Sequence, residues 1–186
     1  MLYTDGIGDY DNQFVSHFVD GRVSAEVVQW LTEMTTYGKL LDLMVKIGYT
    51  TGVYDLFHIG HLNILRNAKL ACDYLIVGVT TDELAINSKG TTPVISFAER
   101  LAIVESIKYV DMVVPQTSYD KIEAWNNLHF NVMFVGDDWK GSEKWVNLEK
   151  ELDSKGVSIV YFPYTVQTSS TKLRKVLELM YSQAST

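Results

Sequence analysis

Residues 49–61 read YTTGVYDLFHIGH, and they decide how the rest of the chain is interpreted. A β-like apolar run precedes this stretch and a helix-like run follows it, so we expect a strand, a loop and a helix start here. His58 and His61 would share one face of a helix that begins near Gly60. The helix start would then bring together two imidazoles, free backbone N–H groups and the positive end of the helix dipole. Gly60 has no side chain beyond Cα, so a ligand could approach the backbone there. The stretch therefore predicts a polyphosphate site.

Two histidines at this spacing also fit half of a metal site, or simply the cap of a helix. The chain has four histidines and one cysteine, and no second pair of ligands follows at the spacing of a zinc site. We therefore expect no protein-bound metal ion.

The composition limits the function classes that fit this chain of 186 residues. A 47% hydrophobic and 21% charged chain fits one compact domain with an appendage. The net charge of −7 argues against a nucleic-acid-binding surface, so any anion site must be local. The single cysteine, Cys72, fits a reducing cytoplasm. No apolar run approaches the ~18 residues of a membrane span, and the acidic N-terminus is unlike a secretory signal. We expect a cytoplasmic protein without membrane insertion.

Alternating strand and helix patterns from residue 45 onward predict the fold. Strands are expected at residues 45–50, 74–80, 112–114, 132–135 and 157–162, and helices at 61–71, 97–107, 119–128, 142–152 and from 168 to about 180. Residues 82–93 between them are expected to form a loop. This order is typical of an α/β fold: a Rossmann-like, doubly wound, five-stranded parallel sheet with helices on both faces. Ligands bind beyond the carboxyl ends of such strands.

Residues 1–44 form an N-terminal extension, and residues 45–186 form the main domain. Ser24 can cap a helix from Ala25 to about Gly38, with an apolar face. We expect this helix to pack on the main domain or on a second subunit. A partner-binding or lipid-surface helix is the alternative, although its few basic residues argue against anionic membranes.

Residues 52–61 resemble the signature of the nucleotidyltransferase superfamily that includes the cytidylyltransferases, Gly-x-Phe-Asp-x-x-His-x-Gly-His. Tyr54 replaces the phenylalanine. Further matching blocks stand at residues 80–83, 106–111, 135–139 and 169–173, and the block GDDW at 136–139 is similar to the glycerol-phosphate branch of the family. The resemblance implies that an alcohol phosphate, sn-glycerol 3-phosphate first of all, attacks the α-phosphorus of CTP to give CDP-glycerol and diphosphate. It also implies Mg²⁺ bound mainly through the nucleotide phosphates, and a homodimer.

The resemblance also assigns site residues. It implies catalytic roles for His58, His61, Lys89 and Arg100. It implies that the nucleotide contacts Thr51, Gly52, Val53, Tyr54, Asp55, His58, Gly60, His61, Lys89, Asp137, Asp138, Thr168, Ser169, Ser170 and Thr171. It places the acceptor against Arg100, Lys108, Asp111 and Trp139. Asp55 is expected to orient its loop or a histidine, Lys89 to close over the phosphates, and Trp139 to cover the pocket or join the core.

Residues 164–170, YTVQTSS, depart from the family pattern Arg-Thr-Glu-Gly-Ile-Ser-[Ser/Thr]. The arginine is missing, which leaves the choice of base open, and Tyr164 is a candidate to stack on the base instead. The alternatives are therefore cytidylyl or adenylyl transfer to choline, ethanolamine or another polyol phosphate. A catalytically silent scaffold domain is a further alternative.

Overall fold

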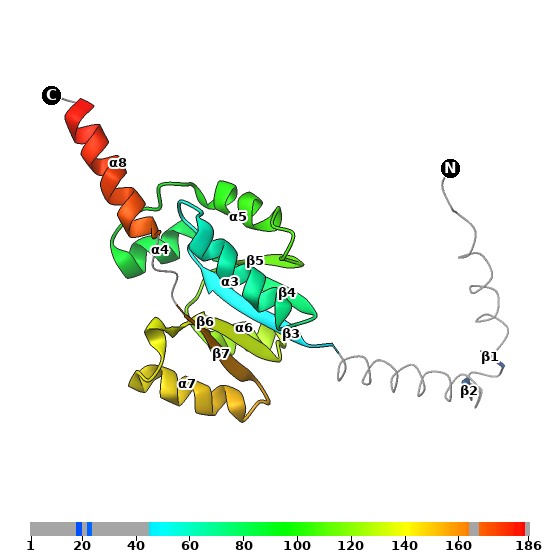
Figure 1. Cartoon of the computed structure of the whole chain (residues 1–186). Coiled ribbons are helices and arrows are strands. Elements are labelled where there is room, and N and C mark those ends of the chain that lie inside the picture. Colours follow the sequence, from blue (N-terminus) through cyan, green and yellow to red (C-terminus); the bar gives the residue numbers. More distant parts are fainter. Residues whose placement is uncertain (1–17, 20–21, 24–44, 164–167, 185–186) are drawn as a thin grey trace. The chain divides into compact units, whose positions relative to one another are not determined.

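The computed structural model describes residues 18–19, 22–23, 45–163 and 168–184 (Figure 1). The chain divides into two units, residues 1–44 and 45–186. In the first unit, strands β1 (Phe18–Val19) and β2 (Arg22–Val23) pair in antiparallel fashion. The helix predicted from Ala25 and the segment 164–167 lie outside the described residues.

The second unit is built on one parallel sheet of five strands. These are β3 (Ile47–Gly52), β4 (Tyr74–Thr80), β5 (Met112–Gln116), β6 (Val132–Gly136) and β7 (Ser158–Phe162). Their order is β5-β4-β3-β6-β7, so the winding reverses beside β3. The structure confirms the predicted doubly wound sheet, and its carboxyl edge at β3 and β6 is where such folds bind ligands.

Helices cover both faces of this sheet. The helices are α3 (Ile59–Leu70), α4 (Asp82–Lys89), α5 (Phe97–Glu105), α6 (Lys121–Leu128), α7 (Glu143–Asp153) and α8 (Ser170–Ala184), with a short 3₁₀ turn η1 (Asp137–Trp139) after β6. Alternate residues of β6 separate two apolar cores: Val132 and Phe134 are buried with α3 and α5, whereas Met133 and Val135 are buried with α7. The period of two follows from the pleat of a strand. Figure 1 shows α8 extending away from the sheet.

Helix α4 corrects the prediction of a loop at residues 82–93. The Thr81 side chain accepts a hydrogen bond from the Leu84 N–H at 3.3 Å, and acidic Asp82 and Glu83 occupy the first turn. Gly90, with φ of +67°, ends the helix in the left-handed conformation that glycine adopts readily. Lys89 is therefore the last residue of a helix.

Candidate active site

The loop between β3 and α3 places two histidines side by side. The His58 ring caps α3, because its Nδ1 accepts a hydrogen bond from the Gly60 N–H at 3.0 Å. The His61 ring stacks on it, with 4.1 Å between ring centroids. The buried Tyr54 ring supports His61 edge-on at 5.3 Å. Helix α3 begins at Ile59, so the predicted helix start and the shared face of the two imidazoles are confirmed.

Backbone strain helps to shape this loop. Tyr54 and Leu56 adopt φ of +56° and +48°, in the left-handed region that costs a side-chain-bearing residue roughly 1–2 kcal/mol. The chain can thereby turn sharply out of β3 and bring the imidazoles over the sheet edge.

Partial burial lowers the pKa of His58 below its usual range, so its ring is neutral at neutral pH. Because Nδ1 accepts a hydrogen bond, the proton of the neutral ring lies on Nε2. His58 thus offers one N–H donor, and does so at the positive end of a helix dipole.

Asp55 ties the histidine loop to two other segments. Its buried carboxylate accepts hydrogen bonds from the N–H groups of Val94 and Ile95 at 3.0 and 2.9 Å. It also accepts one from the Arg174 guanidinium of α8 at 2.7 Å. The Ser170 hydroxyl donates to the Asp55 carbonyl at 2.7 Å. We call these contacts the Asp55 clamp. Asp55 is expected to orient either its loop or a histidine, and these contacts support the orientation of the loop.

The Asp55 clamp predicts an acid-sensitive contribution to stability. Burial raises the pKa of Asp55, but the N–H groups of Ile95 and Val94 and the Arg174 guanidinium outweigh it and hold the pKa below its usual range. The carboxylate therefore stabilises the fold above the unfolded pKa of about 3.9, and this contribution is lost as pH falls through the folded pKa. We expect Asp55→Asn to lower the free energy of unfolding at neutral pH by about 1.5–3 kcal/mol. The difference from wild type should shrink below about pH 4.

Urea unfolding of both proteins across pH measures this difference. Asp153→Asn, which removes an exposed carboxylate from the end of α7, is the matched control and should be near neutral at every pH. Equal stability of Asp55→Asn and wild type at neutral pH would refute the stabilising role of the clamp.

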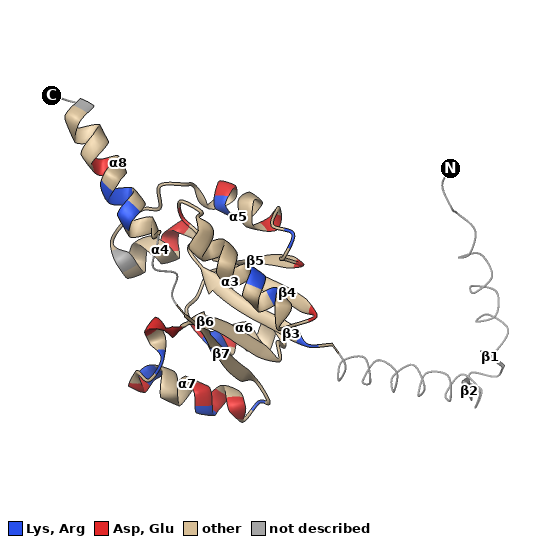
Figure 2. Ribbon diagram, viewed as in Figure 1, with Lys and Arg blue, Asp and Glu red and all other residues tan. Residues whose placement is uncertain are grey.

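A cavity of about 360 Å³ lies between the histidine loop and α8, and we call it the α8 cavity. His61, Ser170, Thr171 and the ion pair of Arg174 with Asp55 line it. Figure 2 shows that the basic residues of α8 gather in its first half, near the body of the domain. The first turn of α8 adds the positive end of a helix dipole. The hydroxyls, the imidazole and the helix start of the α8 cavity therefore suit an anion, while Asp55 offsets the charge of Arg174.

Ser169 and Thr168 precede α8. The N–H of Lys172 donates to the Ser169 hydroxyl at 3.3 Å, and the N–H of Leu173 donates to the Ser169 carbonyl at 3.1 Å. Ser169 thus caps the helix, while Ser170 and Thr171 line the cavity.

A second cavity of about 510 Å³ opens at the carboxyl ends of four strands, and we call it the sheet-edge cavity. Gly52, Thr80, Gln116 and Gly136 line it, and each is the last residue of its strand. Val53 lines both cavities, so they adjoin at the start of the histidine loop. A ligand in the α8 cavity would lie beside His61, on which His58 stacks.

Lys121 in the sheet-edge cavity is a functional candidate that the sequence did not reveal. Only 8% of the residue is exposed, and its Nζ donates to the Thr51 hydroxyl at 3.2 Å. Burial, followed by the nearby Lys144, lowers its pKa to about 8. From the sequence, a lysine in the first turn of a helix is expected to be exposed to solvent. The burial of Lys121 becomes apparent only once the neighbouring strands are in place around it.

Arg100 lies behind the site instead of inside it. Its side chain is fully buried. The guanidinium donates to the carbonyls of Ile95 at 3.0 Å, Thr80 at 2.8 Å and Val53, and to Asp82 at 2.6 Å. These bonds use four of its five N–H donors. Arg100 thus holds the histidine loop to the end of β4, and the structure does not place it toward an acceptor phosphate.

Lys108 and Asp111 lie at the opposite edge of the sheet. Both follow α5 and precede β5, so they stand at the amino ends of the strands. Asp111 accepts hydrogen bonds from the Leu75 N–H at 2.7 Å and from Lys69 Nζ at 2.6 Å, and exposed Lys108 lies over the Tyr109 ring. Neither contacts the cavities of its own chain, contrary to the predicted acceptor contacts.

The remaining predicted residues differ in their placement. Trp139 is 56% exposed and lines the sheet-edge cavity, so it is a cover and not a core residue. Asp137 and Asp138 are exposed beside it in η1. Lys89 ends α4, and its side chain lies outside the described part of the structure.

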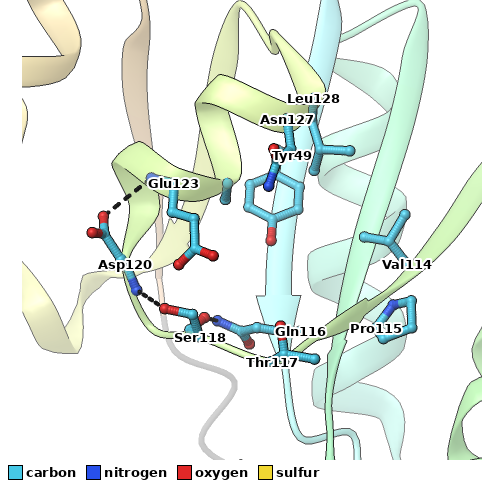
Figure 3. Close-up of a pocket in the computed structure, with 11 residues that line it drawn as sticks. Tyr49, Val114, Pro115, Gln116, Thr117, Ser118, Asp120, Glu123, Asn127 and Leu128 are labelled. Carbon is cyan, nitrogen blue, oxygen red and sulfur yellow. Dashed lines mark hydrogen bonds between the residues drawn. The ribbon is translucent and has the colours of Figure 1, made fainter.

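A third hollow of about 180 Å³ lies along α6 (Figure 3). Its polar groups bond mainly to one another: the Asp120 N–H donates to the Ser118 hydroxyl at 3.1 Å, and Gln116 Nε2 donates to the Ser118 carbonyl at 3.0 Å. Asp120 Oδ1 accepts from the Ile122 and Glu123 N–H groups as the cap of α6. These contacts are those of a helix start, so we do not assign chemistry to this hollow.

Among the described residues, no three His, Cys, Asp or Glu side chains are grouped to hold a metal ion. Likewise, no helix in the described part is long and apolar enough to cross a membrane.

Comparisons with known proteins match this chain over the part that carries the site. A family model described as cytidylyltransferase-like matches residues 49–176. Glycerol-3-phosphate cytidylyltransferase of Bacillus subtilis (strain 168) is 34% identical over 127 residues, which are 68% of this chain and 92% of that protein. Ethanolamine-phosphate cytidylyltransferase of Dictyostelium discoideum is 41% identical over 95 residues, which are 50% of this chain and 26% of that protein.

The fold also has solved counterparts. The crystal structure of the lipopolysaccharide core biosynthesis protein from Thermoplasma volcanium GSS1 superposes with a TM-score of 0.55 at 26% identity. It covers 65% of this chain and 97% of that chain.

Proposed function

Because this chain belongs to the cytidylyltransferase-like family of nucleotidyltransferases, we propose that it joins CTP to a small phosphorylated alcohol, with sn-glycerol 3-phosphate as the acceptor. The products are CDP-glycerol and diphosphate. The match to the relatives named for glycerol 3-phosphate spans 92% of their length. The match to a relative named for ethanolamine phosphate has a higher identity, but it spans only 26% of that protein. The cytidylyltransferase activity is common to both groups, and the acceptor is the part that we propose.

The stacked histidines at the start of α3 carry this proposal. His61 lines the α8 cavity and His58 stacks on it, while the sheet-edge cavity adjoins the α8 cavity at Val53. The α8 cavity has anion-binding character, and the sheet-edge cavity opens at the strand ends. We assign the β- and γ-phosphates to the α8 cavity, with Ser170, Thr171 and Arg174. We assign the cytosine and the acceptor to the sheet-edge cavity. The α-phosphate then lies beside His58 and His61, where the two cavities meet.

The chemistry that follows is a direct displacement. An acceptor phosphate oxygen forms a bond to the α-phosphorus, and the bond from that phosphorus to the bridging oxygen breaks, so diphosphate leaves. The acceptor oxygen is already anionic near neutral pH, so no strong base is needed. Positioning and neutralisation of charge therefore dominate, and they are supplied by imidazole N–H and backbone N–H donors.

We propose that Mg²⁺ enters with CTP, bound mainly through phosphate oxygens and waters, as is usual for this ion. It would supply charge neutralisation on the triphosphate. A homodimer and a cytoplasmic location remain predictions of the sequence.

Diphosphate release tests the proposed function. We expect sn-glycerol 3-phosphate and Mg²⁺ to give diphosphate with CTP, with little from ATP, UTP or GTP, and mass spectrometry to identify CDP-glycerol. CTP alone should raise the melting temperature, since saturation at about 100 times Kd adds about 2.7 kcal/mol of stability. Turnover only with another phosphorylated alcohol would refute sn-glycerol 3-phosphate as the acceptor but would support the cytidylyl transfer. An absence of both turnover and a thermal shift would contradict the activity.

A further inference from the structure

Helix α8 carries an exposed apolar patch in its second half. Val176, Leu179 and Met180 are 54%, 62% and 63% exposed, and we call these three residues the α8 patch. Because they stand at positions i, i+3 and i+4, they lie on one face of the helix. Figure 1 shows that this half of α8 extends away from the sheet. Apolar side chains that gather on one exposed face indicate an interaction surface, whereas scattered ones do not.

The two halves of α8 have different surroundings. In the first half, the Ser170 hydroxyl donates to the Asp55 carbonyl and the Arg174 guanidinium donates to the Asp55 carboxylate, each at 2.7 Å. The cytidylyltransferase-like model ends at residue 176, so most of the α8 patch lies beyond the matched residues. The patch is therefore a feature of this chain that the activity of the family does not account for.

We propose that the α8 patch binds the same patch on a second copy of this chain, with the two helices antiparallel and Leu179 near the two-fold axis. A two-fold pair brings one surface against itself, so a single apolar face supplies both sides of the interface. This pairing goes beyond the proposed function and does not depend on it.

The charges of α8 favour the antiparallel arrangement. Lys172, Arg174 and Lys175 lie in its first half, whereas Glu178 lies in its second half (Figure 2). The carboxyl end of a helix also carries partial negative charge. In an antiparallel pair, the basic half of each helix lies beside the negative end of the other. A parallel pair would bring the two basic halves together, and like charges repel.

An antiparallel pair centred on Leu179 also leaves room for both domains. Ala184, the last residue of α8, would lie beside Arg174 of the other copy, because both are equally far from Leu179. Arg174 is bound to the body of its own domain, so the two bodies lie at opposite ends of the pair. Two helices that meet over about three turns bury less than the ~1,200 Å² of a standard interface. We therefore expect a weak pair, with a Kd of roughly 10–100 µM.

Pairing and nucleotide binding should strengthen each other. Ser170 and Thr171, in the first turn of α8, line the α8 cavity. A ligand in this cavity fixes the start of the helix whose second half forms the pair, and a coupling between two sites is reciprocal. This link rests on the proposed function, and on that basis CTP with Mg²⁺ should tighten the pair by roughly 5-fold or more.

Sedimentation velocity of the full chain from about 1 to about 200 µM, without and with CTP and Mg²⁺, measures the pairing across the expected Kd. Leu179→Glu places like charges near the axis and should raise the Kd by at least ~30-fold. Tyr181→Glu is the matched control, because it adds the same charge to a side chain that is 74% exposed. Residue 181 lies about 200° around the helix from Leu179, so this variant should pair like wild type.

Cross-linking tests the orientation of the helices. In a Cys72→Ser background, which removes the single cysteine, Leu179→Cys should form an interchain disulfide with oxidised glutathione, because the two positions meet at the axis. Lys172→Cys, near the start of the helix, should stay unlinked. Linking at both positions would show parallel helices and overturn the proposed arrangement.

The remaining outcomes separate this inference from the proposed function. A wild type that stays monomeric at about 200 µM, or a Leu179→Glu variant that pairs like wild type, would overturn the docking surface and leave the cytidylyl transfer standing. A monomeric wild type that sediments with vesicles of phosphatidylcholine and phosphatidylserine, when Leu179→Glu does not, would assign the patch to a lipid surface and overturn it as well. A pair that CTP does not tighten, in a protein that turns CTP over, would overturn the link to the nucleotide. A protein that pairs but neither binds nor turns over CTP would contradict the proposed function and support the docking surface.

Discussion

His58→Asn and His61→Ala should each lower kcat for CDP-glycerol formation by roughly 10²–10³-fold, the usual cost of removing one donor from a developing anionic centre. His58 also caps α3 through Nδ1. Asparagine is a good helix cap, so His58→Asn keeps an acceptor for the Gly60 N–H while removing the Nε2–H donor. Rates come from product formation with saturating CTP, and folding from circular dichroism melting curves.

His129→Asn provides the matched control for the histidine variants. His129 is exposed at the end of α6 with φ of +48°, a conformation that asparagine tolerates, so its replacement should leave both fold and rate unchanged. If a folded His58→Asn or His61→Ala retained a rate within about twofold of wild type, the imidazoles would be helix-capping groups only, because loss of a catalytic donor costs far more.

Arg100→Met should destabilise the domain by about 3–5 kcal/mol, because it leaves buried carbonyl groups of Val53 and Thr80 without their donor and Asp82 without its cation. At about 2–4 °C per kcal/mol, the melting temperature should fall by roughly 6–20 °C. Thermal and urea unfolding measure the effect.

Arg66→Met is the comparison for this variant. Arg66 is exposed on α3 and donates to the Asn63 side chain at 3.1 Å, so its loss should cost less than about 0.5 kcal/mol. An Arg100→Met protein that melts like wild type and only raises KM for the acceptor would reverse the assignment, and would place Arg100 on the acceptor phosphate as the sequence predicted.

The sheet could be predicted because its signals are local. Six consecutive residues of β4, from Leu75 to Thr80, are buried, and their apolar run is visible in the sequence. Helix α4 is equally local, but it is short and has little apolar periodicity, so the apolar pattern predicts a loop there. Its signals were present in the Thr81 cap, the acidic first turn and Gly90.

The environment of single charged side chains could not be predicted in the same way. The hydrogen bond from Lys121 to Thr51 joins positions 70 residues apart, and Arg100 reaches back 47 residues to Val53. Such contacts are set by how strands and helices stack, which the local pattern around either residue does not encode. The loop and helix start at residues 52–61 could be predicted because the signature is one continuous stretch of sequence.

The Asp55 clamp also has a consequence for how the domain matures during translation. Asp55 and Arg174 are 119 positions apart, which at roughly 5–20 residues per second is about 6–24 s of synthesis. The histidine loop therefore leaves the ribosome well before the helix that secures it. A nascent chain that stops short of residue 174 lacks the partner of Asp55 and one wall of the α8 cavity. Nucleotide affinity should thus be gained late in synthesis, when α8 joins the rest of the domain.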